Sequence, residues 1–359
     1  MTDQTKNTLR ISAAQIRLLE RLCNASGVSG DEGEVRKIVL EEIRPHADEV
    51  KVDALGNVLA VHHAKTASPM RVMVDAHMDE VGFMLIKDEG EGIFRFDTIG
   101  GIDTRCLVGK PVLVGKERIP GVIGAKPIHL TEPDETKKPI SLDVLRIDIG
   151  PSNGKVKIGD RAVFATTFAR LGTNRLRAKA LDDRLGVVSL IELLKHAPEN
   201  VELLCNFAVQ EELGLRGARV AAFGFGPDLA IALDATPAVD LPGWDGAENV
   251  RYNTRQGAGP ALYVADSATL ADPRLLRHLV ETAEALNIPY QFRQPGGGGT
   301  DAGSIHLQRA GIPAVSVSVP TRYLHTPASI ARLDDWQNTL SLVHGALQRL
   351  TPGLLAVER

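Results

Sequence analysis

The chain has 359 residues, 43% of them hydrophobic and 24% charged, which is ordinary for a globular protein with a well-buried core. The net charge of -4 and the isoelectric point near 6.2 argue against nucleic acid or an anionic membrane as the main partner. The three cysteines, Cys23, Cys106 and Cys205, are far apart and odd in number. We therefore expect neither a disulfide framework nor a thiolate metal site.

No segment of the sequence is typical of a leader peptide or a membrane span. The first residues lack an apolar run, and no apolar stretch approaches the roughly 20 residues that a spanning helix needs. A cytoplasmic protein of one large domain or two is the simplest expectation.

Residues 1–82 begin with two predicted helices and continue with strands. Apolar residues at helical spacing predict helices over 16–23 and 34–43, and runs of β-branched residues predict strands over 49–52, 57–61 and 71–74.

The sequence pattern changes from 83 to 167, where short strands alternate with Gly and Pro turns. These strands are predicted at 93–96, 111–114, 121–124, 145–149 and 162–164. Their even spacing indicates a small β-barrel or sandwich.

Helices and strands alternate again from residue 168 to the end. Helices are predicted at 184–196, 273–286 and 333–350, and strands at 201–209, 229–233 and 314–319. Such alternation predicts a three-layer α/β/α domain with a mixed, mostly parallel sheet. We expect residues 1–82 and 168–359 to form this domain, with the β-rich domain 83–167 inserted into it.

Two neighbouring glutamates, Glu211 and Glu212, stand just after the apolar run 203–209. A carboxylate at the end of a buried strand must be ion-paired, protonated or bound to a cation. Within residues 210–218 Arg216 is the only basic residue, and one guanidinium does not serve two carboxylates that an extended backbone points to opposite sides. One carboxylate as a metal ligand beside a proton acceptor explains the pair; solvated strand-end acids or an acidic first helical turn are the alternatives.

Other side chains of the metal-binding types also stand at the ends of predicted elements. They are His77 after 72–76, Asp182 at the start of a helix, Asp234 after 231–233 and His325 beyond 315–319. Each alone has an ordinary explanation as a core histidine, a helix cap, a turn residue or a loop residue. Ligands gather at the carboxyl ends of strands in open α/β sheets, so their recurrence there favours a metal site. Histidines and carboxylates suit zinc, cobalt or manganese, and the number of acids favours two ions and a hydrolytic reaction.

Five motifs together carry a family resemblance. They are AHMDEVGFM at 76–84, ALDDR at 180–184, QEELGLRGA at 210–218, GGTDAG at 298–303 and RYLH at 322–325. In this order they resemble metallopeptidase family forty-two, the dinuclear glutamyl aminopeptidases and tetrahedral (TET) aminopeptidases. The likeness spans nearly the whole chain and implies removal of N-terminal residues from short peptides.

The resemblance also implies roles for single residues. It implies two divalent ions, Zn²⁺, Co²⁺ or Mn²⁺, with His77 and Asp234 on one, Glu212 and His325 on the other, and Asp182 bridging them. Glu211 would be the general base that activates water, and Asp79 would orient His77.

The substrate region and the assembly are implied less directly. Gly298, Gly299 and Thr300 would form a wall beside the active site, and Arg322 would bind a substrate carboxylate or pair with a neighbouring acid. The inserted domain would mediate dimerisation, and dimers would assemble into a dodecamer. The preferred N-terminal residue stays open. The competing functions are a carboxypeptidase or amidohydrolase of the broader zinc superfamily, a glycosidase using the glutamate pair, and a non-enzymatic assembly protein.

Overall fold

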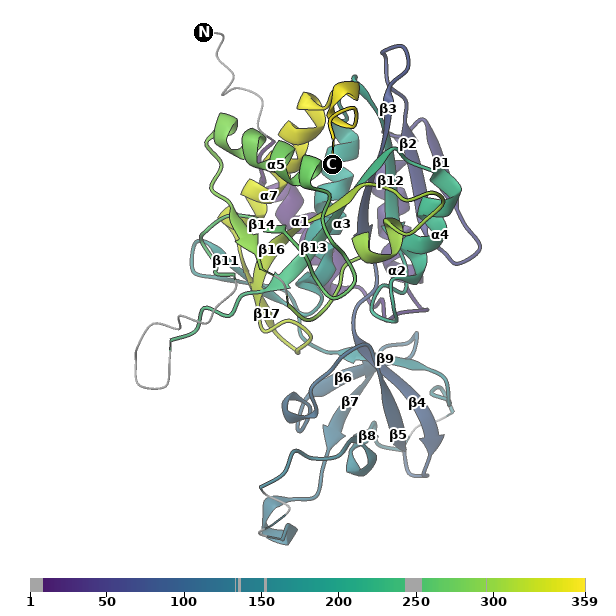
Figure 1. Cartoon of the computed structure of the whole chain (residues 1–359). Coiled ribbons are helices and arrows are strands. Elements are labelled where there is room, and N and C mark those ends of the chain that lie inside the picture. Colours follow the sequence, from purple (N-terminus) through teal and green to yellow (C-terminus); the bar gives the residue numbers. More distant parts are fainter. Residues whose placement is uncertain are drawn as a thin grey trace.

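The computed structural model describes residues 9–132, 134, 137–151, 154–242, 254–294 and 296–358. These residues form an α/β part and a smaller β-barrel, which lie one above the other in Figure 1. The predicted α/β fold with an inserted β-barrel is confirmed. None of the described helices combines the length and the apolar character that crossing a membrane requires.

Among the described residues, the α-helices all belong to the α/β part. They are α1 (Ala13–Asn24), α2 (Gly33–Ile43), α3 (Leu181–Lys195), α4 (Arg216–Phe225), α5 (Pro273–Leu286), α6 (Ala302–Ile305) and α7 (Leu333–Arg349). Local signals define some of these starts. Ser12 and Gln15 form a capping box at α1, and Asp272 accepts a hydrogen bond from the backbone of Arg274 at α5. The sequence analysis predicts neither α4 nor α6, which are short and rich in Ala and Gly.

The large sheet has eleven strands. They are β1 (Glu49–Val52), β2 (Val58–His62), β3 (Met70–His77), β10 (Ala169–Leu171), β11 (Arg175–Ala178), β12 (Val201–Ala208), β13 (Leu229–Pro237), β14 (Ala261–Tyr263), β15 (Gln291–Arg293), β16 (Ala314–Arg322) and β17 (Ser329–Arg332). The order is β1-β2-β12-β3-β13-β16-β17-β11-β10, and β14 and β15 branch from β16. The four central strands β12, β3, β13 and β16 are parallel to their neighbours in this set. Their carboxyl ends therefore meet at one edge of the sheet.

Helices cover both faces of this sheet because its strands alternate their side chains between two hydrophobic cores. Val72 and Val74 of β3 pack in the larger core with residues of α1, α2, α3, α5 and α7. Met73, between them, packs in a second core with residues of α4 and α6. The central strands are thereby fixed on both sides, and the loops at their ends are held in place.

The barrel is closed by six antiparallel strands in the order β4-β5-β8-β7-β6-β9. They are β4 (Gly82–Asp88), β5 (Ile93–Ile99), β6 (Pro111–Val114), β7 (Ile119–Gly124), β8 (Arg146–Asp148) and β9 (Arg161–Phe164). Phe83 lies at the centre of its core, with edge-to-face contacts to Phe96 and Phe164 at centroid distances of 5.2 and 5.1 Å. The barrel follows β3 and precedes β10 in the chain, so it joins the sheet close to His77.

Candidate metal centre

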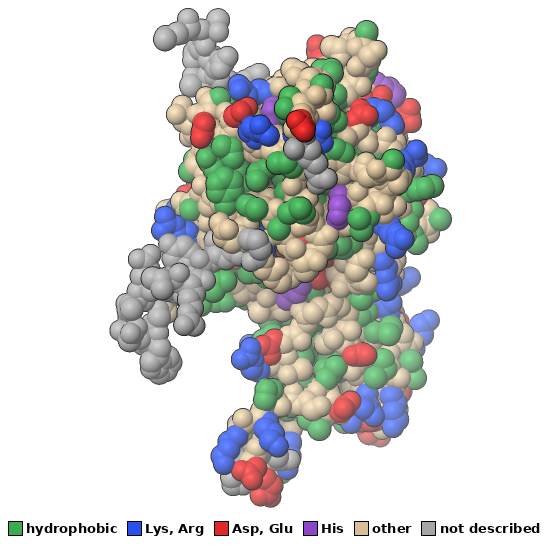
Figure 2. Space-filling model, viewed as in Figure 1, with side chains coloured by type: hydrophobic (Ala, Val, Ile, Leu, Met, Phe, Trp, Pro, Cys, Tyr) green, Lys and Arg blue, Asp and Glu red, His purple; other side chains and the backbone are tan. Residues whose placement is uncertain are grey.

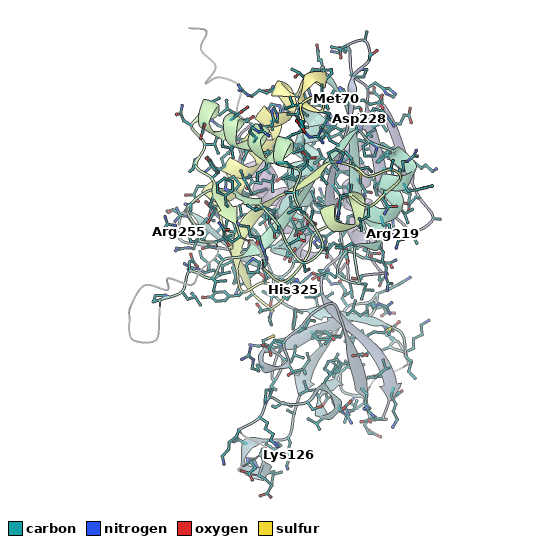
Figure 3. All side chains as sticks on the ribbon, viewed as in Figure 1. Met70, Lys126, Arg219, Asp228, Arg255 and His325 are labelled. Atoms are coloured by element: carbon teal, nitrogen blue, oxygen red, sulfur yellow. The ribbon has the colours of Figure 1, made fainter. Side chains whose placement is uncertain are left out.

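The predicted ligand residues gather at the edge of the sheet where the parallel strands end. His77 is the last residue of β3, Asp234 lies within β13, and Glu212 follows β12. His325 comes three residues after β16, and Asp182 lies at the start of α3. Figure 3 places His325 at the junction between the α/β part and the barrel, where histidine and acidic side chains reach the surface in Figure 2.

The backbone of the glutamate pair differs from the prediction. β12 ends at Ala208, and Gln210 adopts a left-handed conformation with φ of 57°. The backbone N–H of Gly214 then donates to the carbonyl of Glu211 at 2.8 Å, which closes a turn. The extended backbone that we expected for Glu211 and Glu212 is therefore wrong: the pair lies in a turn, and Arg216 does not pair with either acid among the described contacts.

Two clusters of ligand-type side chains result from this arrangement. The inner group consists of His77, Asp183 and Asp234, and the outer group of Asp182, Glu212 and His325. Within each group, the potential ligand atoms all lie within 4.8 Å of one another. The inner group is buried, with His77 only 2% exposed, whereas the side chain of His325 is 37% exposed.

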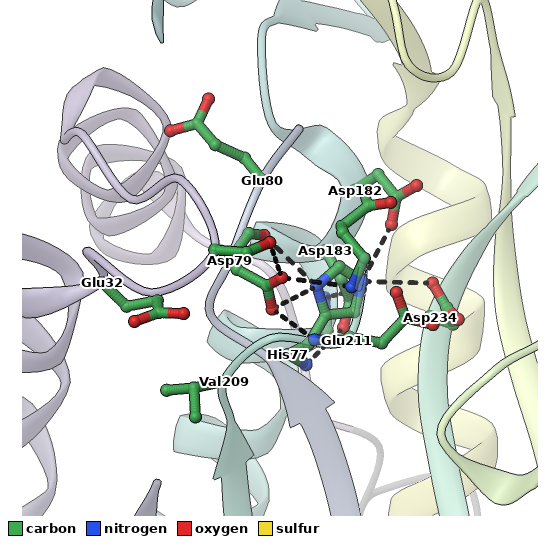
Figure 4. Close-up of polar contacts among 12 residues, drawn as sticks. Glu32, His77, Asp79, Glu80, Asp182, Asp183, Val209, Glu211 and Asp234 are labelled. Carbon is green, nitrogen blue, oxygen red and sulfur yellow. Dashed lines mark hydrogen bonds and ion pairs between the residues drawn. The ribbon is translucent and has the colours of Figure 1, made fainter. Parts of the chain in front are cut away.

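Asp182 links the two groups, one carboxylate oxygen to each. Its Oδ1 lies 3.2 Å from Nε2 of His77, and its Oδ2 lies 3.3 Å from Nε2 of His325. His77 Nε2 is also 3.8 Å from Asp234, and His325 Nε2 is 3.3 Å from Glu212. Figure 4 shows His77 between Asp182, Asp234 and Asp79. One carboxylate thus faces both groups.

Asp183 is a member of the site that the sequence analysis did not assign. Its carboxylate accepts hydrogen bonds from the backbone N–H groups of His77 at 3.3 Å and Gly186 at 3.0 Å. A side chain at position 186 would collide with this carboxylate, so the glycine leaves room for it. The signals for Asp183 in the sequence are its position next to Asp182 and the glycine inside a predicted helix.

Asp79 positions both His77 and the glutamate turn. Its carboxylate accepts from the backbone N–H of Glu211 at 3.0 Å and of Glu212 at 3.2 Å, and from the hydroxyl of Ser29 at 2.5 Å. It also lies 3.5 Å from Nδ1 of His77. One fully buried carboxylate therefore fixes a ligand ring and the turn that carries two acids.

A buried ion pair ties the two ligand-bearing segments together. Lys179 Nζ donates to both carboxylate oxygens of Glu80, at 2.7 and 2.9 Å, and to the carbonyl of Ala25. Glu80 follows the segment that carries His77 and Asp79, and Lys179 precedes Asp182. The pair therefore holds these segments side by side.

The carboxylates of the site are strongly perturbed by burial. Burial raises the pKa of Glu212 to about 8 and that of Asp234 to about 7, and it raises the pKa of Glu211 well above its usual range. The pKa of Asp182 is different: burial raises it, but hydrogen bonds to His325 and His77 outweigh burial and lower it.

The two histidines are shifted in the direction of the charged form. Burial lowers the pKa of His325, but the hydrogen bond to Asp182 and the charge of Glu212 outweigh it and raise the pKa to about 10. For His77, burial is likewise outweighed by the charge of Glu211 and by hydrogen bonds to carboxylates, so its pKa lies well above the usual value. The acids of the site thus attract positive charge.

A cavity of about 560 Å³ opens beside both groups. Gly298 and Gly299 line it, as does Glu211, whereas Thr300 is buried and its hydroxyl lies 2.5 Å from that of Ser316. Arg322 is not among the lining residues and forms hydrogen bonds to Asp240 at 2.6 and 2.9 Å. The sequence analysis did not single out several other lining residues: Leu215, Tyr263, Ala268 and Arg293.

The barrel contributes backbone atoms to the outer group. The carbonyl oxygen of Gly101, just after β5, lies 2.8 Å from Nδ1 of His325. A Cβ atom on Gly100, whose φ is +80°, would lie 3.3 Å from Glu212 and 2.7 Å from Val81. The segment that leaves β5 therefore packs closely against two residues of the outer group.

Known proteins resemble this chain in sequence over most of its length. The model of the M42 glutamyl aminopeptidase family matches residues 56–342. A putative aminopeptidase of Acetivibrio thermocellus is 38% identical over 92% of this chain and 97% of its own length. The lysyl aminopeptidase of Pyrococcus furiosus is 34% identical over 93% and 97%. The glutamyl aminopeptidase of Lactococcus lactis is 30% identical over 92% and 95%.

Solved structures share the fold. A TET aminopeptidase from a thaumarchaeon of marine sediment has a TM-score of 0.90 and 34% identity, covering 96% of this chain and 98% of that one. The TET1 peptidase of Pyrococcus horikoshii, which can assemble into a tetrahedron or a large octahedral shell, gives 0.82 and 32%, covering 94% and 100%. A Thermotoga maritima protein described as an endoglucanase gives 0.75 and 32%, covering 92% and 96%.

The family match covers most of the chain, and the full-length relatives exceed 30% identity or reach it. The resemblance predicted from five motifs is confirmed, and the family is metal-dependent. The chain therefore belongs to the M42 glutamyl aminopeptidase family and is an aminopeptidase, a hydrolase of peptide bonds.

Proposed function

We propose that this protein removes N-terminal residues from short peptides with the help of two divalent cations, and that Glu211 is the general base. The observation that carries the proposal is the position of Asp182, which turns one carboxylate oxygen toward each ligand group. A shared carboxylate between two sets of ligands is typical of two-ion hydrolytic sites.

The donor set fits such ions. Each group offers one imidazole and two carboxylates, a combination that suits zinc, cobalt or manganese. Burial raises the pKa values of Glu212 and Asp234, and the neighbouring histidines offset only part of this effect. Cations at these positions would reverse that effect, since nearby positive charge stabilises the ionised carboxylate. We infer that His77, Asp183 and Asp234 would hold one ion, Glu212 and His325 the other, and Asp182 both.

The chain's own residues then have defined tasks. When bound, the cations would supply positive charge that polarises the scissile carbonyl and makes water easier to deprotonate. Glu211 would accept the proton of the attacking water and pass it to the leaving amine, a task that suits a carboxylate with a raised pKa. Asp79 would keep His77 and the backbone of Glu211 in place throughout.

A glycosidase is the competing function, because one structural neighbour is described as an endoglucanase. Glycoside hydrolysis needs two carboxyl groups roughly 5–9 Å apart that flank the sugar bond without a metal ion. Glu212 instead lies 3.3 Å from Nε2 of His325, within a group of ligand-type side chains. This arrangement favours the peptidase.

Self-association is the second part of the proposal. The TET1 peptidase of Pyrococcus horikoshii can assemble into a tetrahedron or a large octahedral shell, and we propose that the inserted domain 83–167 dimerises this chain and that the dimers form a dodecamer. Exposed apolar side chains on the barrel domain support this, among them Ile128, Leu130 and Val144, which are 73%, 60% and 57% exposed. Light scattering of the purified protein tests it: a monomer at micromolar concentration would contradict the proposal.

The activity is tested with protein stripped by a chelator and reloaded with Zn²⁺, Co²⁺ or Mn²⁺. We expect metal-dependent hydrolysis of aminoacyl p-nitroanilides with a free amine, and none of their N-acetylated forms or of β-glycosides. Equal hydrolysis of the N-acetylated forms would indicate a carboxypeptidase or amidohydrolase. Activity on glycosides alone, or activity that survives removal of metal, would contradict the proposed function.

A further inference from the structure

We propose that Arg293 forms a subsite that binds a carboxylate of the peptide substrate, an inference that rests on the proposed aminopeptidase function. Arg293 lines the cavity beside the two ligand groups and is only 6% exposed. Among the described residues that line this cavity, it is the only arginine or lysine.

The guanidinium is held close to the inner group by neighbouring strands. Arg293 ends β15 and pairs in register with Tyr263 at the end of β14, and its Cζ lies 4.8 Å from the centre of the Tyr263 ring. Its Nε donates to the hydroxyl of Thr236 at 3.3 Å. Thr236 follows Asp234 by two residues on β13, so both side chains point to the same side of the sheet.

The hydrogen bonds of Arg293 leave donors free. Besides the bond to Thr236, Nη1 donates to the carbonyl of Gln294 at 3.0 Å and Nη2 to that of Gly297 at 2.7 Å. A guanidinium has five N–H groups, so one remains on each terminal nitrogen. All three partners are neutral, and no carboxylate of the described residues forms an ion pair with it within 4.0 Å.

Other cations near the site have protein carboxylates as partners. Arg322 pairs with Asp240, and the buried Lys179 pairs with Glu80. Burying a charge without a counter-ion is unfavourable, and Arg293 is buried without one, at 6% exposure against 2% for Lys179. This contrast indicates that its counter-ion comes from the ligand.

The chemistry of the cavity specifies the kind of ligand that Arg293 would bind. Four carboxylates line it: Asp182, Glu211, Glu212 and Asp234. None of these carboxylates forms an ion pair with Arg293 within 4.0 Å, and in the proposed function they serve the two cations and the general base. Planar guanidinium groups bind carboxylates with two parallel hydrogen bonds, so a substrate carboxylate fits the free donors of Arg293.

Two parts of a peptide can supply this carboxylate, an acidic N-terminal side chain or the free C-terminus of a very short peptide. The first test uses wild-type protein and matched substrates: glutamyl against glutaminyl p-nitroanilide, and leucyl-glycine against leucyl-glycinamide. We expect kcat/KM to favour the carboxylate by about 10- to 100-fold in one of these pairs, as a charge-assisted hydrogen bond predicts. The pair that shows the preference identifies the source of the carboxylate.

The second test compares substitutions. Arg293→Met should bring the preference in that pair close to one, and Arg293→Lys should keep part of it, because it keeps the charge. Arg309→Met is the matched control: Arg309 also lies over an aromatic ring, at 5.3 Å from Phe223, and donates to a backbone carbonyl, but it is exposed and outside the cavity. It should leave the preference unchanged.

The outcomes separate the subsite from the proposed function. Hydrolysis of neutral substrates with ratios near one in both pairs would overturn the carboxylate subsite and leave the aminopeptidase in place. A preference that persists in correctly folded Arg293→Met protein, checked by circular dichroism, would also overturn it. Failure to cleave any aminoacyl substrate would overturn the proposed function and the subsite together.

Discussion

The inner and outer groups contain similar side chains, but different kinds of structural element carry them. His77 and Asp234 of the inner group belong to central strands that two hydrophobic cores enclose. Glu212 and His325 of the outer group lie on a turn and a loop, and the barrel residue Gly101 holds His325 through a backbone carbonyl. We therefore expect the inner group to bind its ion more tightly and to be coupled to the stability of the sheet. The ion affinity of the outer group should depend instead on the position of the barrel relative to the sheet.

The largest effect is expected from removing the residue that the two groups share. Asp182→Asn should weaken the binding of both ions and reduce peptidase activity to background. The loss of affinity should exceed the roughly 10- to 100-fold that is typical when a residue supporting a metal ligand is removed. Metal content per subunit by mass spectrometry checks this. The control Asp143→Asn removes a carboxylate that is 83% exposed on the barrel domain and should change neither quantity. Retention of two ions in Asp182→Asn would show that the groups are independent.

Glu211 separates chemistry from metal binding. Glu211→Gln should lower kcat by about 10²- to 10⁴-fold, the usual contribution of a general base, while both ions remain bound. Steady-state kinetics and metal analysis of the same preparation provide the two readouts. Loss of an ion together with activity would assign Glu211 to the ligand set instead.

Alanine substitution of the two histidines compares the groups directly. His77→Ala should cost one ion and also lower the melting temperature, because it leaves buried carboxylates without their partner. His325→Ala should cost one ion with a smaller change in melting temperature, since its side chain is 37% exposed. Equal decreases in melting temperature would contradict the proposed difference in structural support between the two groups.

Stability should depend on pH in a defined direction when metal is absent. The pKa values of Glu212 and Asp234 are raised to about 8 and 7, so the folded protein binds more protons than the unfolded chain above about pH 4. The raised pKa of His325, about 10, acts in the same direction from about pH 6.5. The melting temperature of chelator-treated protein should therefore fall from pH 5 to pH 9, and added divalent ions should reduce the fall. A melting temperature that rises over this range without metal would contradict the assignment.

The smallest effect tests the contact between barrel and outer group. Gly100→Ala places a methyl group 2.7 Å from Val81 and 3.3 Å from Glu212, and it should weaken binding of the outer ion by about 10-fold, with the inner ion unaffected. Gly109→Ala is the matched control, because Gly109 has a similar φ of +75° but no atom within 4 Å of the added Cβ. If the two substitutions weaken binding of the outer ion equally in metal titrations, backbone strain alone would explain the effect.

Much of the site could be predicted because its signals are local in the sequence. His77, Asp234 and Glu212 each follow an apolar run, and such runs become central parallel strands whose ends meet. The fold could be predicted from the sequence for the same reason, because strand and helix signals alternate along the α/β part and short strands dominate the barrel.

The remaining features depend on contacts between distant segments. Arg293 ends a strand of three residues that is recognisable only through its pairing with β14. Gly101 contacts His325, which is 224 positions away in the chain, only because the folded barrel lies next to the sheet. The turn at Glu211 depends on hydrogen bonds to Asp79, 132 positions away, which overrides the extended backbone that the apolar run predicts.

Titration of metal-free protein with Co²⁺, followed by visible absorption and activity on an aminoacyl p-nitroanilide, tests the two-ion site most directly. We predict two ions per subunit that bind in sequence, with full activity only after the second, and loss of both phases in Asp182→Asn. A single binding phase that saturates activity at one ion per subunit would contradict the account.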